Sequence, residues 1–477
     1  MYARNATSSA TLKLIVETDQ ALNNDLICAI ATPPGQGGVG IVRLSGEGAH
    51  TIAAELCKNP LRPRTAVYTD FFDAEELLDN GLALWFPGPN SFTGEDVVEL
   101  QGHGGPIIQH RILNALCQRG ARLARPGEFS ERAFMNGKLD LAQAEAVADL
   151  ISSTSIAASK AALNTLKGAF SQMVTAIALD IANMRVRVEA AIDFPEEDIE
   201  ILQEARVAQD IAKTITSLES ILAQANQGRL INSGISVALI GKPNVGKSSL
   251  LNALAGEEAA IVTNVPGTTR DLLKVDLVID SLPIRLVDTA GLRDSDDEVE
   301  KIGIARAKAQ AMEADLTLYV AAADEITTQV DVSDLGKNLA SLLGSNDTAT
   351  EMPTSNILLV INKSDLNLAA GAPEDVASVR VSAKTGEGLD LLKKAIQESV
   401  GFGQENVPFA ARQRHILILQ DTLAKVNAAA DALAQNLGAE FVAEELFIAH
   451  QCLGEVTGIV TPDDLLGKIF SEFCIGK

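Results

Sequence analysis

The feature that most constrains this chain is Gly241-Lys-Pro-Asn-Val-Gly-Lys-Ser248, which fits the phosphate-binding pattern G-x-x-x-x-G-K-[ST]. It lies between an apolar run typical of a strand, Ile235 to Ile240, and a run from Ser249 onward that is typical of a helix. The glycines let backbone N–H groups face a phosphate at a helix N-terminus, and Lys247 reaches the β- and γ-phosphates. Ser248 can ligate magnesium. The pattern predicts that an α/β domain binds a nucleoside triphosphate.

Two later motifs predict how magnesium is bound and which nucleotide base is selected. Asp288-Thr-Ala-Gly291 follows the apolar run Ile284 to Val287, where a carboxylate can hold the magnesium shell and a glycine N–H can approach the γ-phosphate. Asn362-Lys-Ser-Asp365 follows another such run, Ile357 to Ile361. The carboxylate of Asp365 can accept hydrogen bonds from N1–H and the 2-amino group of guanine, whereas adenine would present an acceptor to it. The sequence therefore favours guanine.

Gly267-Thr-Thr-Arg-Asp271 and Ser382-Ala-Lys384 complete an ordered set of motifs found in GTPases of the Ras-like superfamily. We expect Ser248 and Thr269 to ligate magnesium. The predicted GTP-binding residues are Asn244, Val245, Gly246, Lys247, Ser248, Ser249, Thr263, Asn264, Val265, Pro266, Gly267, Thr268, Thr269, Asp288, Thr289, Ala290, Gly291, Asn362, Lys363, Asp365, Ser382, Ala383 and Lys384.

The residue after the Asp288 motif is Leu292, where Ras-like switches have a glutamine that orients the attacking water. An alkyl side chain cannot do this, so another group must orient the water and another cation must take the role of an arginine finger. Asn244 offers a neutral oxygen close to the expected β- and γ-phosphates, where it can bind a monovalent ion together with switch-loop carbonyls. The alternative is that Asn244 caps the following turn.

Composition restricts the partners. The chain has 39 Lys plus Arg against 63 Asp plus Glu, a net charge of −24, which argues against a generally basic nucleic-acid-binding surface. Any RNA contact must use a local patch or a partner. The five cysteines are widely spaced without C-x-x-C or zinc spacing, which favours a reducing cytoplasm. No long apolar run predicts a membrane span, so we expect a cytoplasmic protein, with a weak transit peptide as the alternative.

The first 138 residues predict a mixed α/β domain with a sheet, because glycine and proline turns separate apolar runs at Ile27 to Ala31, Val39 to Leu44 and Val97 to Leu100. The glycine cluster Gly35 to Gly40 leads into a strand and not a helix. It is therefore not a dinucleotide-binding fingerprint.

The segments on either side of the GTPase motifs are predicted to be helical. Residues 139–194 contain no proline and are rich in Ala and Leu, Pro195 ends this stretch, and Ile199 to Gln227 continues it. His415 to Leu437 and Phe441 to Leu453 are again typical of helices that must pack against a partner. Because domain termini usually lie close together, an inserted GTPase domain is the economical arrangement. The predicted division is an N-terminal domain at 1–138, a helical domain at 139–234 and 401–477, and a GTPase domain at 235–400.

Five segments outside the GTPase motifs form a specific combination. They are Ala31-Thr-Pro-Pro-Gly-Gln-Gly-Gly-Val-Gly-Ile-Val-Arg-Leu-Ser-Gly46, Phe92-Thr-Gly-Glu-Asp-Val-Val-Glu99, Arg125-Pro-Gly-Glu-Phe-Ser-Glu-Arg-Ala-Phe-Met-Asn-Gly-Lys138, Ile192-Asp-Phe-Pro-Glu-Glu-Asp198 and Cys474-Ile-Gly-Lys477. With a GTPase segment between them, they resemble the MnmE/TrmE family of tRNA modification GTPases, from about residue 25 to the last residue.

The resemblance implies a multidomain α/β plus α fold: an N-terminal tetrahydrofolate-binding and dimerisation domain, a discontinuous helical domain, and an inserted Ras-like P-loop GTPase domain that pairs with its copy in the presence of potassium. Potassium would contact Asn244 and the backbone of Thr263, Val265 and Thr268. The resemblance also implies a homodimer that joins the flavoprotein MnmG in a heterotetramer. Together they would install a carboxymethylaminomethyl group at C5 of the wobble uridine of certain tRNAs.

Glu300 stands twelve residues after Asp288. The resemblance marks it as a catalytic glutamate that acts through a bridging water in the paired GTPase domains. By charge pattern alone, it is a solvated carboxylate in the acidic run Asp294 to Glu300. Both interpretations stay open at this point.

Reduced folates carry a glutamate tail and a pterin with amide-like donors, so their site needs cations and a carboxylate. At positions that match the family's folate-binding motifs, Arg43, Lys138 and Lys477 can supply the cations, and Glu99 can accept from the pterin. The expected cofactor is 5,10-methylenetetrahydrofolate, with 5-formyltetrahydrofolate as an analogue. Cys474 is expected to act as a nucleophile or acid, or else to be a small buried side chain.

Two departures from the family pattern are visible. Residues 1 to about 22 extend beyond the usual start, and Thr263-Asn-Val-Pro266 stands where the family commonly has Asp-Ile-Ala before the glycine. Pro266 restricts φ in the switch loop. The alternative function is a regulatory GTPase of ribosome assembly without modification chemistry. The folate-type motifs and Cys474 favour the tRNA-modifying enzyme.

Overall fold

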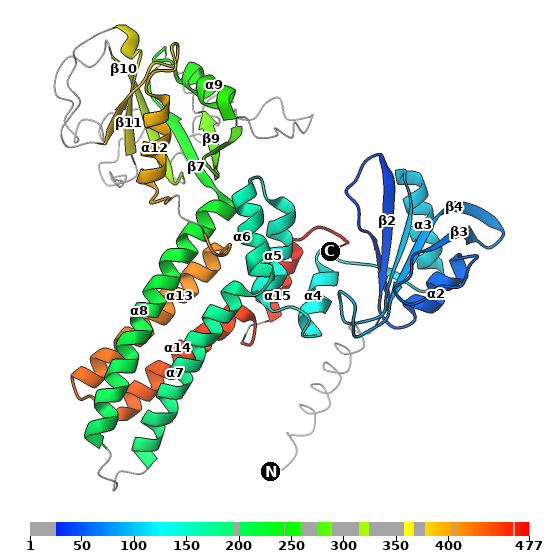
Figure 1. The fold of residues 1–477 in the computed structure, drawn as a ribbon, viewed down its shortest axis with the longest axis horizontal. Coiled ribbons are helices and arrows are strands. Elements are labelled where there is room, and N and C mark those ends of the chain that lie inside the picture. Colours follow the sequence, from blue (N-terminus) through cyan, green and yellow to red (C-terminus); the bar gives the residue numbers. More distant parts are fainter. Residues whose placement is uncertain are drawn as a thin grey trace, which may run out of the picture. The chain divides into compact units, whose positions relative to one another are not determined.

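The protein is described by a computed structural model that covers residues 25–193, 200–242, 244–258, 274–288, 314–323, 357–366, 377–403, 407–460 and 463–476. It divides into two compact units (Figure 1). Unit 1 lies within Met1–Ala148 and His450–Lys477, and unit 2 within Asp149–Ala449. The four-part division by sequence stays a prediction. Among the described residues, none of the helices combines the length and apolar character needed to cross a membrane.

Unit 1 contains a six-stranded sheet with the order β3-β4-β5-β2-β1-β6. The only parallel pair in this sheet is β1 with β6, and the other neighbours are antiparallel. The antiparallel register of β2 and β5 places Arg43 directly opposite Glu99. The strands are β1 (Ile27–Ile30), β2 (Gly37–Ser45), β3 (Val67–Asp73), β4 (Glu76–Phe86), β5 (Val97–Gly104) and β6 (Arg122–Leu123).

Alternation along the strands separates the two faces of this sheet, because successive side chains of a strand point to opposite sides. Val42 and Leu44 of β2 are buried in the core with α2 (Ala49–Leu56) and α3 (Pro106–Gln118). Residues between these positions, such as Arg43, therefore face the other side. The mixed α/β domain predicted for the first 138 residues has this character.

The C-terminal segment of the chain is part of unit 1. Helix α15 (Asp463–Ser471) contributes Phe470 to a core that also contains Leu141 of α5 (Leu141–Ser152). Phe473 joins the same core. Gly127, which precedes α4 (Glu128–Met135), has a φ of 69°, and a Cβ there would lie 2.4 Å from the carbonyl oxygen of Phe470. The residue before α4 must therefore be glycine for this close approach.

Unit 2 contains the second sheet, with the order β12-β11-β10-β7-β9-β8. Its strands are parallel except for the antiparallel pair β8 and β9. The buried strands are nearly continuous apolar runs, as expected for a parallel sheet covered on both faces. The strands are β7 (Ile235–Ile240), β8 (Lys274–Ile279), β9 (Leu282–Asp288), β10 (Leu316–Ala322), β11 (Ile357–Asn362) and β12 (Ser378–Arg380), accompanied by α9 (Lys247–Glu258), the 3₁₀ helix η2 (Ser364–Leu366) and α12 (Leu389–Ser399).

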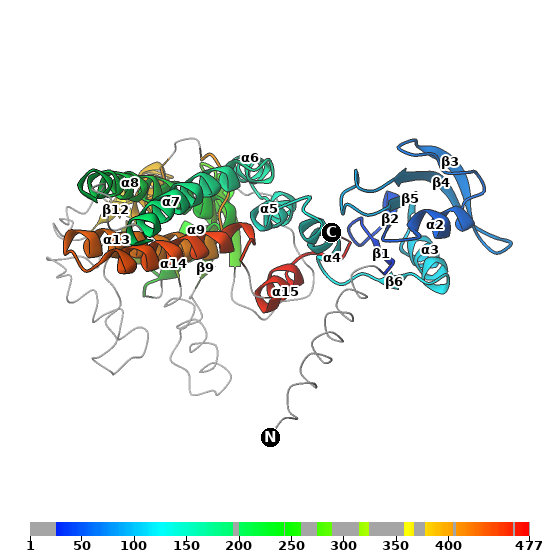
Figure 2. The same ribbon diagram turned by 90° about the horizontal axis from the view of Figure 1, so that it is seen from below.

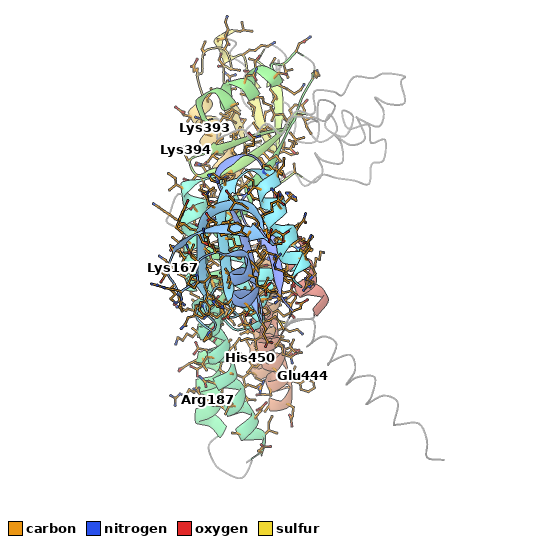
Figure 3. All side chains as sticks on the ribbon, turned by 90° about the vertical axis from the view of Figure 1, so that its right-hand side faces the viewer. Lys167, Arg187, Lys393, Lys394, Glu444 and His450 are labelled. Carbon is orange, nitrogen blue, oxygen red and sulfur yellow. The ribbon has the colours of Figure 1, made fainter. Side chains whose placement is uncertain are left out.

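Unit 2 also contains a bundle of long helices. Helix α8 packs against α7 and α13, and Figures 1 and 2 show these helices side by side with α14. Figure 3 shows Arg187 of α7 and Glu444 of α14 in this bundle, and Lys393 and Lys394 of α12 beside the second sheet. The helices are α6 (Ile156–Leu166), α7 (Ala169–Asp193), α8 (Glu200–Ser233), α13 (Gln413–Ala434) and the first part of α14 (Ala439–Thr457), up to Ala449.

The predicted fold class is confirmed: mixed sheets and a helical part accompany a P-loop GTPase sheet. Two local expectations differ from the structure. Helix α9 begins at Lys247 and not at Ser249, because the end of the phosphate loop is already helical. The proline-free stretch after Lys138 is three helices, since the chain turns after Ser152 and at Gly168, whose φ is 90°.

Candidate functional site

The phosphate loop connects β7 to α9, and glycine permits its close approach to two neighbouring strands. A Cβ on Gly241 would lie 2.2 Å from the carbonyl oxygen of Val320 on β10. Gly246 has a φ of 96°, and a Cβ there would lie 2.3 Å from Nδ2 of Asn362. Both glycines of the motif are therefore required by packing as well as by phosphate binding.

Lys247 and the residues beside it carry the polar groups of this loop. Nζ of Lys247 donates to the carbonyl oxygens of Gly241 at 2.7 Å and Lys242 at 2.9 Å. Ser248 is exposed at the start of α9. Asn244 is exposed with a φ of 66°, and its side chain makes no hydrogen bond to another described residue.

The segment Asn362-Lys-Ser-Asp365, here called the guanine motif, is hydrogen-bonded to the phosphate loop. Nδ2 of Asn362 donates to the carbonyl oxygen of Val245 at 2.9 Å, and its Oδ1 accepts from the backbone N–H of Ala383 at 3.1 Å. Oγ of Ser382 donates to Oδ1 of Asp365 at 2.8 Å. Three motifs that are far apart in sequence thus meet at the carboxyl ends of β7, β11 and β12. Lys363 and Lys384 flank these contacts in sequence.

Several predicted nucleotide residues lie outside the described residues. These are Thr263 to Thr269 and Thr289 to Gly291. The predicted catalytic residue Glu300 also lies outside them, as does Leu292. Asp288 ends β9, whose neighbour β7 leads into the phosphate loop. The backbone of Asp288 therefore lies opposite Leu239, close to the start of the phosphate loop.

In unit 1, Arg43 and Glu99 form an ion pair across β2 and β5. Nε and Nη2 of Arg43 donate to Oε1 of Glu99 at 3.0 and 2.9 Å. The Arg43 guanidinium carbon also lies 5.8 Å from the ring centroids of both Phe92 and Phe129. Sequence reasoning predicted the two charged residues but did not predict that they pair with each other, and it missed both aromatic neighbours.

The C-terminal segment reaches this ion pair. Nη1 of Arg43 donates to the carbonyl oxygen of Gly476 at 3.3 Å. Gly476 has a φ of 92°, and a Cβ there would lie 2.4 Å from the carbonyl oxygen of Ile30. Two residues earlier, Cys474 is exposed, and its carbonyl oxygen accepts from the N–H of Gly127 at 3.4 Å. An exposed thiol does not fit the alternative of a small buried side chain, while Lys477 lies outside the described residues.

Two further polar side chains belong to this neighbourhood. Nε2 of Gln101 donates to Oε2 of Glu99 at 3.1 Å. Residues two apart on a strand share a face, and this spacing was the signal that sequence reasoning did not use. Lys138 is exposed, and its Nζ donates to the carbonyl oxygen of Pro89 at 3.0 Å. Lys138 is thus bonded to the loop that carries Phe92.

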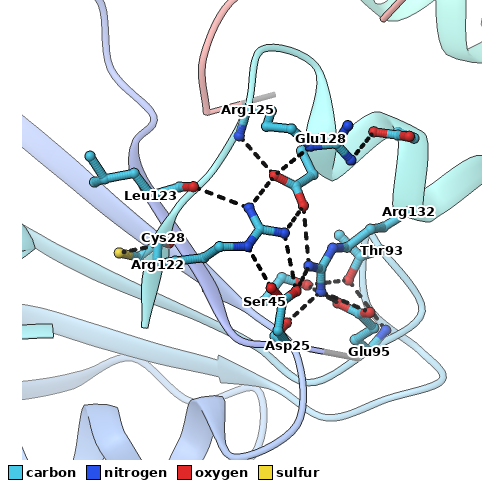
Figure 4. Close-up of polar contacts among 11 residues, drawn as sticks. Asp25, Cys28, Ser45, Thr93, Glu95, Arg122, Leu123, Arg125, Glu128 and Arg132 are labelled. Atoms are coloured by element: carbon cyan, nitrogen blue, oxygen red, sulfur yellow. Dashed lines mark hydrogen bonds and ion pairs between the residues drawn. The ribbon is translucent and has the colours of Figure 1, made fainter. Parts of the chain in front are cut away.

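A partly buried charge network joins α4 to the loop that carries Phe92 and to the sheet (Figure 4). Arg132, only 4% exposed, donates to Asp25 at 2.6 Å, to Glu128 at 3.2 Å and to both carboxylate oxygens of Glu95 at 3.2 Å. Ser45 of β2 donates from its Oγ to Glu95 at 2.7 Å. The network therefore ties the segments that carry Phe92 and Phe129 to the strand that carries Arg43.

The charge network and burial shift the pKa values of two carboxyl groups on α4. Burial acts to raise the pKa of Glu128, but hydrogen bonds from the Arg122 side chain and the Arg125 backbone outweigh it and lower the pKa to about 2. For Glu131, burial raises the pKa, and the charge of Arg125 offsets this only in part. The two carboxyl groups of α4 are therefore shifted in opposite directions.

Comparison with protein families covers both units. A model described as the GTP-binding protein TrmE N-terminus matches residues 26–138, and one described as the MnmE helical domain matches residues 141–474. The chain belongs to the MnmE/TrmE family. Members of the MnmE/TrmE family are tRNA modification GTPases, in agreement with the phosphate and guanine motifs that meet in unit 2.

Solved structures of other GTP-binding proteins are also similar. The G domain of the T. maritima FeoB iron transporter is 29% identical, with 35% of this chain and 98% of that chain covered and a TM-score of 0.24. A GTP-binding protein of Sulfolobus solfataricus in complex with GDP is 17% identical over 61% of this chain and 77% of that chain, with a TM-score of 0.25.

Proposed function

We propose that this chain is a potassium-dependent GTP hydrolase that, with the flavoprotein MnmG, uses a folate one-carbon unit to add a carboxymethylaminomethyl group to C5 of the wobble uridine of certain tRNAs. Family membership supports the GTPase and tRNA parts. The observation that supports the proposed folate chemistry is the hydrogen bond from Arg43 to the carbonyl oxygen of Gly476. It brings the segment that contains Cys474 to the Arg43–Glu99 pair.

In unit 2, Asp365 selects guanine. Its carboxylate is oriented by the Ser382 hydroxyl at 2.8 Å, which leaves acceptor capacity for the two donors of the base. Lys247 exchanges the carbonyl oxygens of Gly241 and Lys242 for phosphate oxygens when GTP binds.

Cations complete the hydrolytic site. The exposed hydroxyl of Ser248 fits magnesium, a hard cation that prefers oxygen ligands, and Thr269 would join it. The exposed amide of Asn244 fits a monovalent cation, with the backbone of Thr263, Val265 and Thr268 as further ligands. Bound there, potassium supplies positive charge beside the phosphates. Glu300 orients the attacking water through a bridging water.

In unit 1, Glu99 is the acceptor for the pterin. Arg43 and Gln101 each hold one of its carboxylate oxygens, so the acceptor is oriented before the ligand arrives. Because the charge of Arg43 is already balanced by Glu99, Lys138 and Lys477 remain as the cations for the glutamate tail. Phe92, 37% exposed, offers apolar ring surface beside the ion pair. The residues present therefore fit a reduced folate.

Cys474 acts on the one-carbon unit as a nucleophile or acid. Its thiol is exposed, and Gly476, two residues later, accepts a hydrogen bond from Arg43. The proposed assembly is a homodimer that binds MnmG as a heterotetramer and acts on tRNA.

The direct test is reconstitution of the modification. The full-length chain is incubated with MnmG, unmodified tRNA, GTP, potassium, 5,10-methylenetetrahydrofolate and either glycine or ammonium, and the tRNA nucleosides are then separated by mass spectrometry. The proposal predicts a modified wobble uridine that requires both proteins and the folate. Unmodified uridine in the complete reaction would contradict it.

A regulatory GTPase of ribosome assembly is the alternative. The same chain would then hydrolyse GTP without binding a reduced folate. A titration with a reduced folate therefore distinguishes the two functions. It uses the full-length chain and not residues 1–138 alone, because the segment around Gly476 contacts Arg43.

A further inference from the structure

Two cysteines of unit 1 are in contact inside its core. Cys28 lies on β1, Cys117 lies near the end of α3, and their Sγ atoms are 3.7 Å apart. Cys28 has no exposed surface, whereas Cys117 is half-buried. A disulfide has an S–S bond of about 2.05 Å, so the two Sγ atoms must move closer together by less than one atomic diameter to form it. The core around both residues already contains β1 and α3.

We propose that Cys28 and Cys117 form a reversible oxidation site that closes to an intramolecular disulfide under peroxide. In the first step, the Cys117 sulfur attacks one oxygen of hydrogen peroxide and the O–O bond breaks. The second oxygen leaves as water, and Cys117 becomes a sulfenic acid. In the second step, Cys28 sulfur bonds to Cys117 sulfur and the S–O bond breaks. The leaving hydroxide takes the Cys28 proton as water. In total, two thiols and one hydrogen peroxide give one disulfide and two waters.

Accessibility assigns the order of these steps. Cys117 is the member of the pair that solvent reaches, so it meets the oxidant first. Burial raises the pKa of Cys28, which keeps it a thiol until an electrophilic sulfur lies beside it. Cys28 Sγ can also donate to the carbonyl oxygen of Arg122 at 3.5 Å. Cys28 is therefore the resolving cysteine.

Other cysteines provide internal controls. Cys57 is half-buried, and burial raises its pKa to about 12, so it reacts slowly with peroxide. Cys474 is exposed and reacts with peroxide at its surface. Peroxide treatment should thus oxidise Cys474 to acids, while Cys28 and Cys117 protect each other from over-oxidation by forming the disulfide.

The test maps the bond in the full-length protein. After peroxide treatment, free thiols are alkylated during unfolding, and the protein is digested with trypsin without a reductant. The expected product joins the peptides 14–43 and 112–119, with a mass two hydrogens below their sum, and a thiol reductant separates them. The bond closes a loop between residues 89 apart, so the oxidised protein should melt several degrees higher.

Matched variants sharpen the result. Cys57→Ser should keep the linked peptide, and Cys117→Ser should lose it. In that second variant, Cys28 should be recovered as an alkylated thiol. Recovery of Cys28 and Cys117 from the wild-type protein as separate peptides, with Cys117 as a sulfinic or sulfonic acid, would overturn the proposal. This measurement is independent of GTP and folate.

Discussion

Nδ2 of Asn362 donates to the carbonyl oxygen of Val245 at 2.9 Å, which joins the guanine motif to the phosphate loop. The bond is buried at both ends, since Asn362 is 2% and Val245 1% exposed. A nucleotide that orders one motif therefore orders the other. This relationship explains why base recognition and phosphate binding are expected to respond together to changes in either motif.

The first prediction concerns the base. Asp365→Asn should weaken GTP binding by about a hundredfold or more, because the amide presents a donor to N1–H of guanine. The same variant should bind xanthosine triphosphate better than GTP. Titration with both nucleotides measures the exchange, and an unchanged GTP affinity would contradict the assignment. Lys394→Ala, at an exposed position of α12 outside the nucleotide motifs, is the control that keeps guanine preference.

The second prediction concerns the cation. GTP turnover in potassium should exceed turnover in sodium at matched ionic strength by about an order of magnitude or more, because charge stabilisation near the transferred phosphate is lost. Asn244→Ala should remove this difference. Steady-state hydrolysis of the full-length protein in each salt tests it. Equal rates in potassium and sodium for the wild-type protein would count against the cation site.

The third prediction concerns Glu300. Glu300→Ala should slow hydrolysis by about an order of magnitude or more while GTP affinity stays near normal, as expected when only a transition-state interaction is lost. Asp294→Ala, in the same acidic run, should leave turnover unchanged. Single-turnover kinetics and nucleotide titration separate the two effects. Full turnover of the Glu300 variant would make this residue a solvated carboxylate.

Much of unit 2 could be predicted because its signals are local. The apolar runs at Ile235, Ile284 and Ile357 predicted strands that the structure contains, and the motif residues follow them directly. Their meeting point also follows from a general rule, since the carboxyl ends of parallel strands lie at one edge of a sheet.

The candidate site of unit 1 was harder to predict because its contacts depend on register and on buried charge. Glu128 and Arg132 lie in a helix of eight residues, and a pattern of charges there predicts exposure. Their partner Asp25 is 107 residues from Arg132 in sequence. The pairing of Arg43 with Glu99 likewise depends on the alignment of β2 and β5, which no local signal specifies.

The fourth prediction concerns acid stability. Glu128 has a pKa of about 2 in the folded protein and an ordinary value of 4.5. Because the folded value is the lower one, its stabilisation is fully present above pH 4.5 and is lost as the pH falls toward 2. Glu128→Gln should cost about 3 kcal/mol at pH 7, since it leaves Arg132 with less charge compensation. This cost should shrink between pH 4.5 and 2.

Glu131 is the matched control on the same helix. Its pKa is raised above 4.5 in the folded protein, so its stabilisation is fully present below pH 4.5 and is lost as the pH rises from 4.5 through the raised folded pKa. Glu131→Gln should therefore change the pH dependence in the opposite sense. Denaturant unfolding of both variants at several pH values measures this. A Glu128→Gln cost that does not vary with pH would contradict the network's role.

The fifth prediction concerns the folate site. Glu99→Ala should abolish detectable binding of 5-formyltetrahydrofolate, because it removes the acceptor for the pterin and leaves Arg43 unbalanced. GTP hydrolysis should persist, since the phosphate loop and guanine motif lie in unit 2. Glu76→Ala is the control: Glu76 pairs with Arg111 in the same unit and is 69% exposed, so its loss should leave folate binding intact.

The folate site is tested by calorimetric titration of the full-length wild-type protein with 5-formyltetrahydrofolate, repeated with the Glu99→Ala and Glu76→Ala variants. We expect saturable binding to the wild-type protein and to Glu76→Ala, and none to Glu99→Ala. Binding that survives in Glu99→Ala would contradict the assigned site. Absence of binding to the wild-type protein would contradict the one-carbon function and favour the regulatory GTPase.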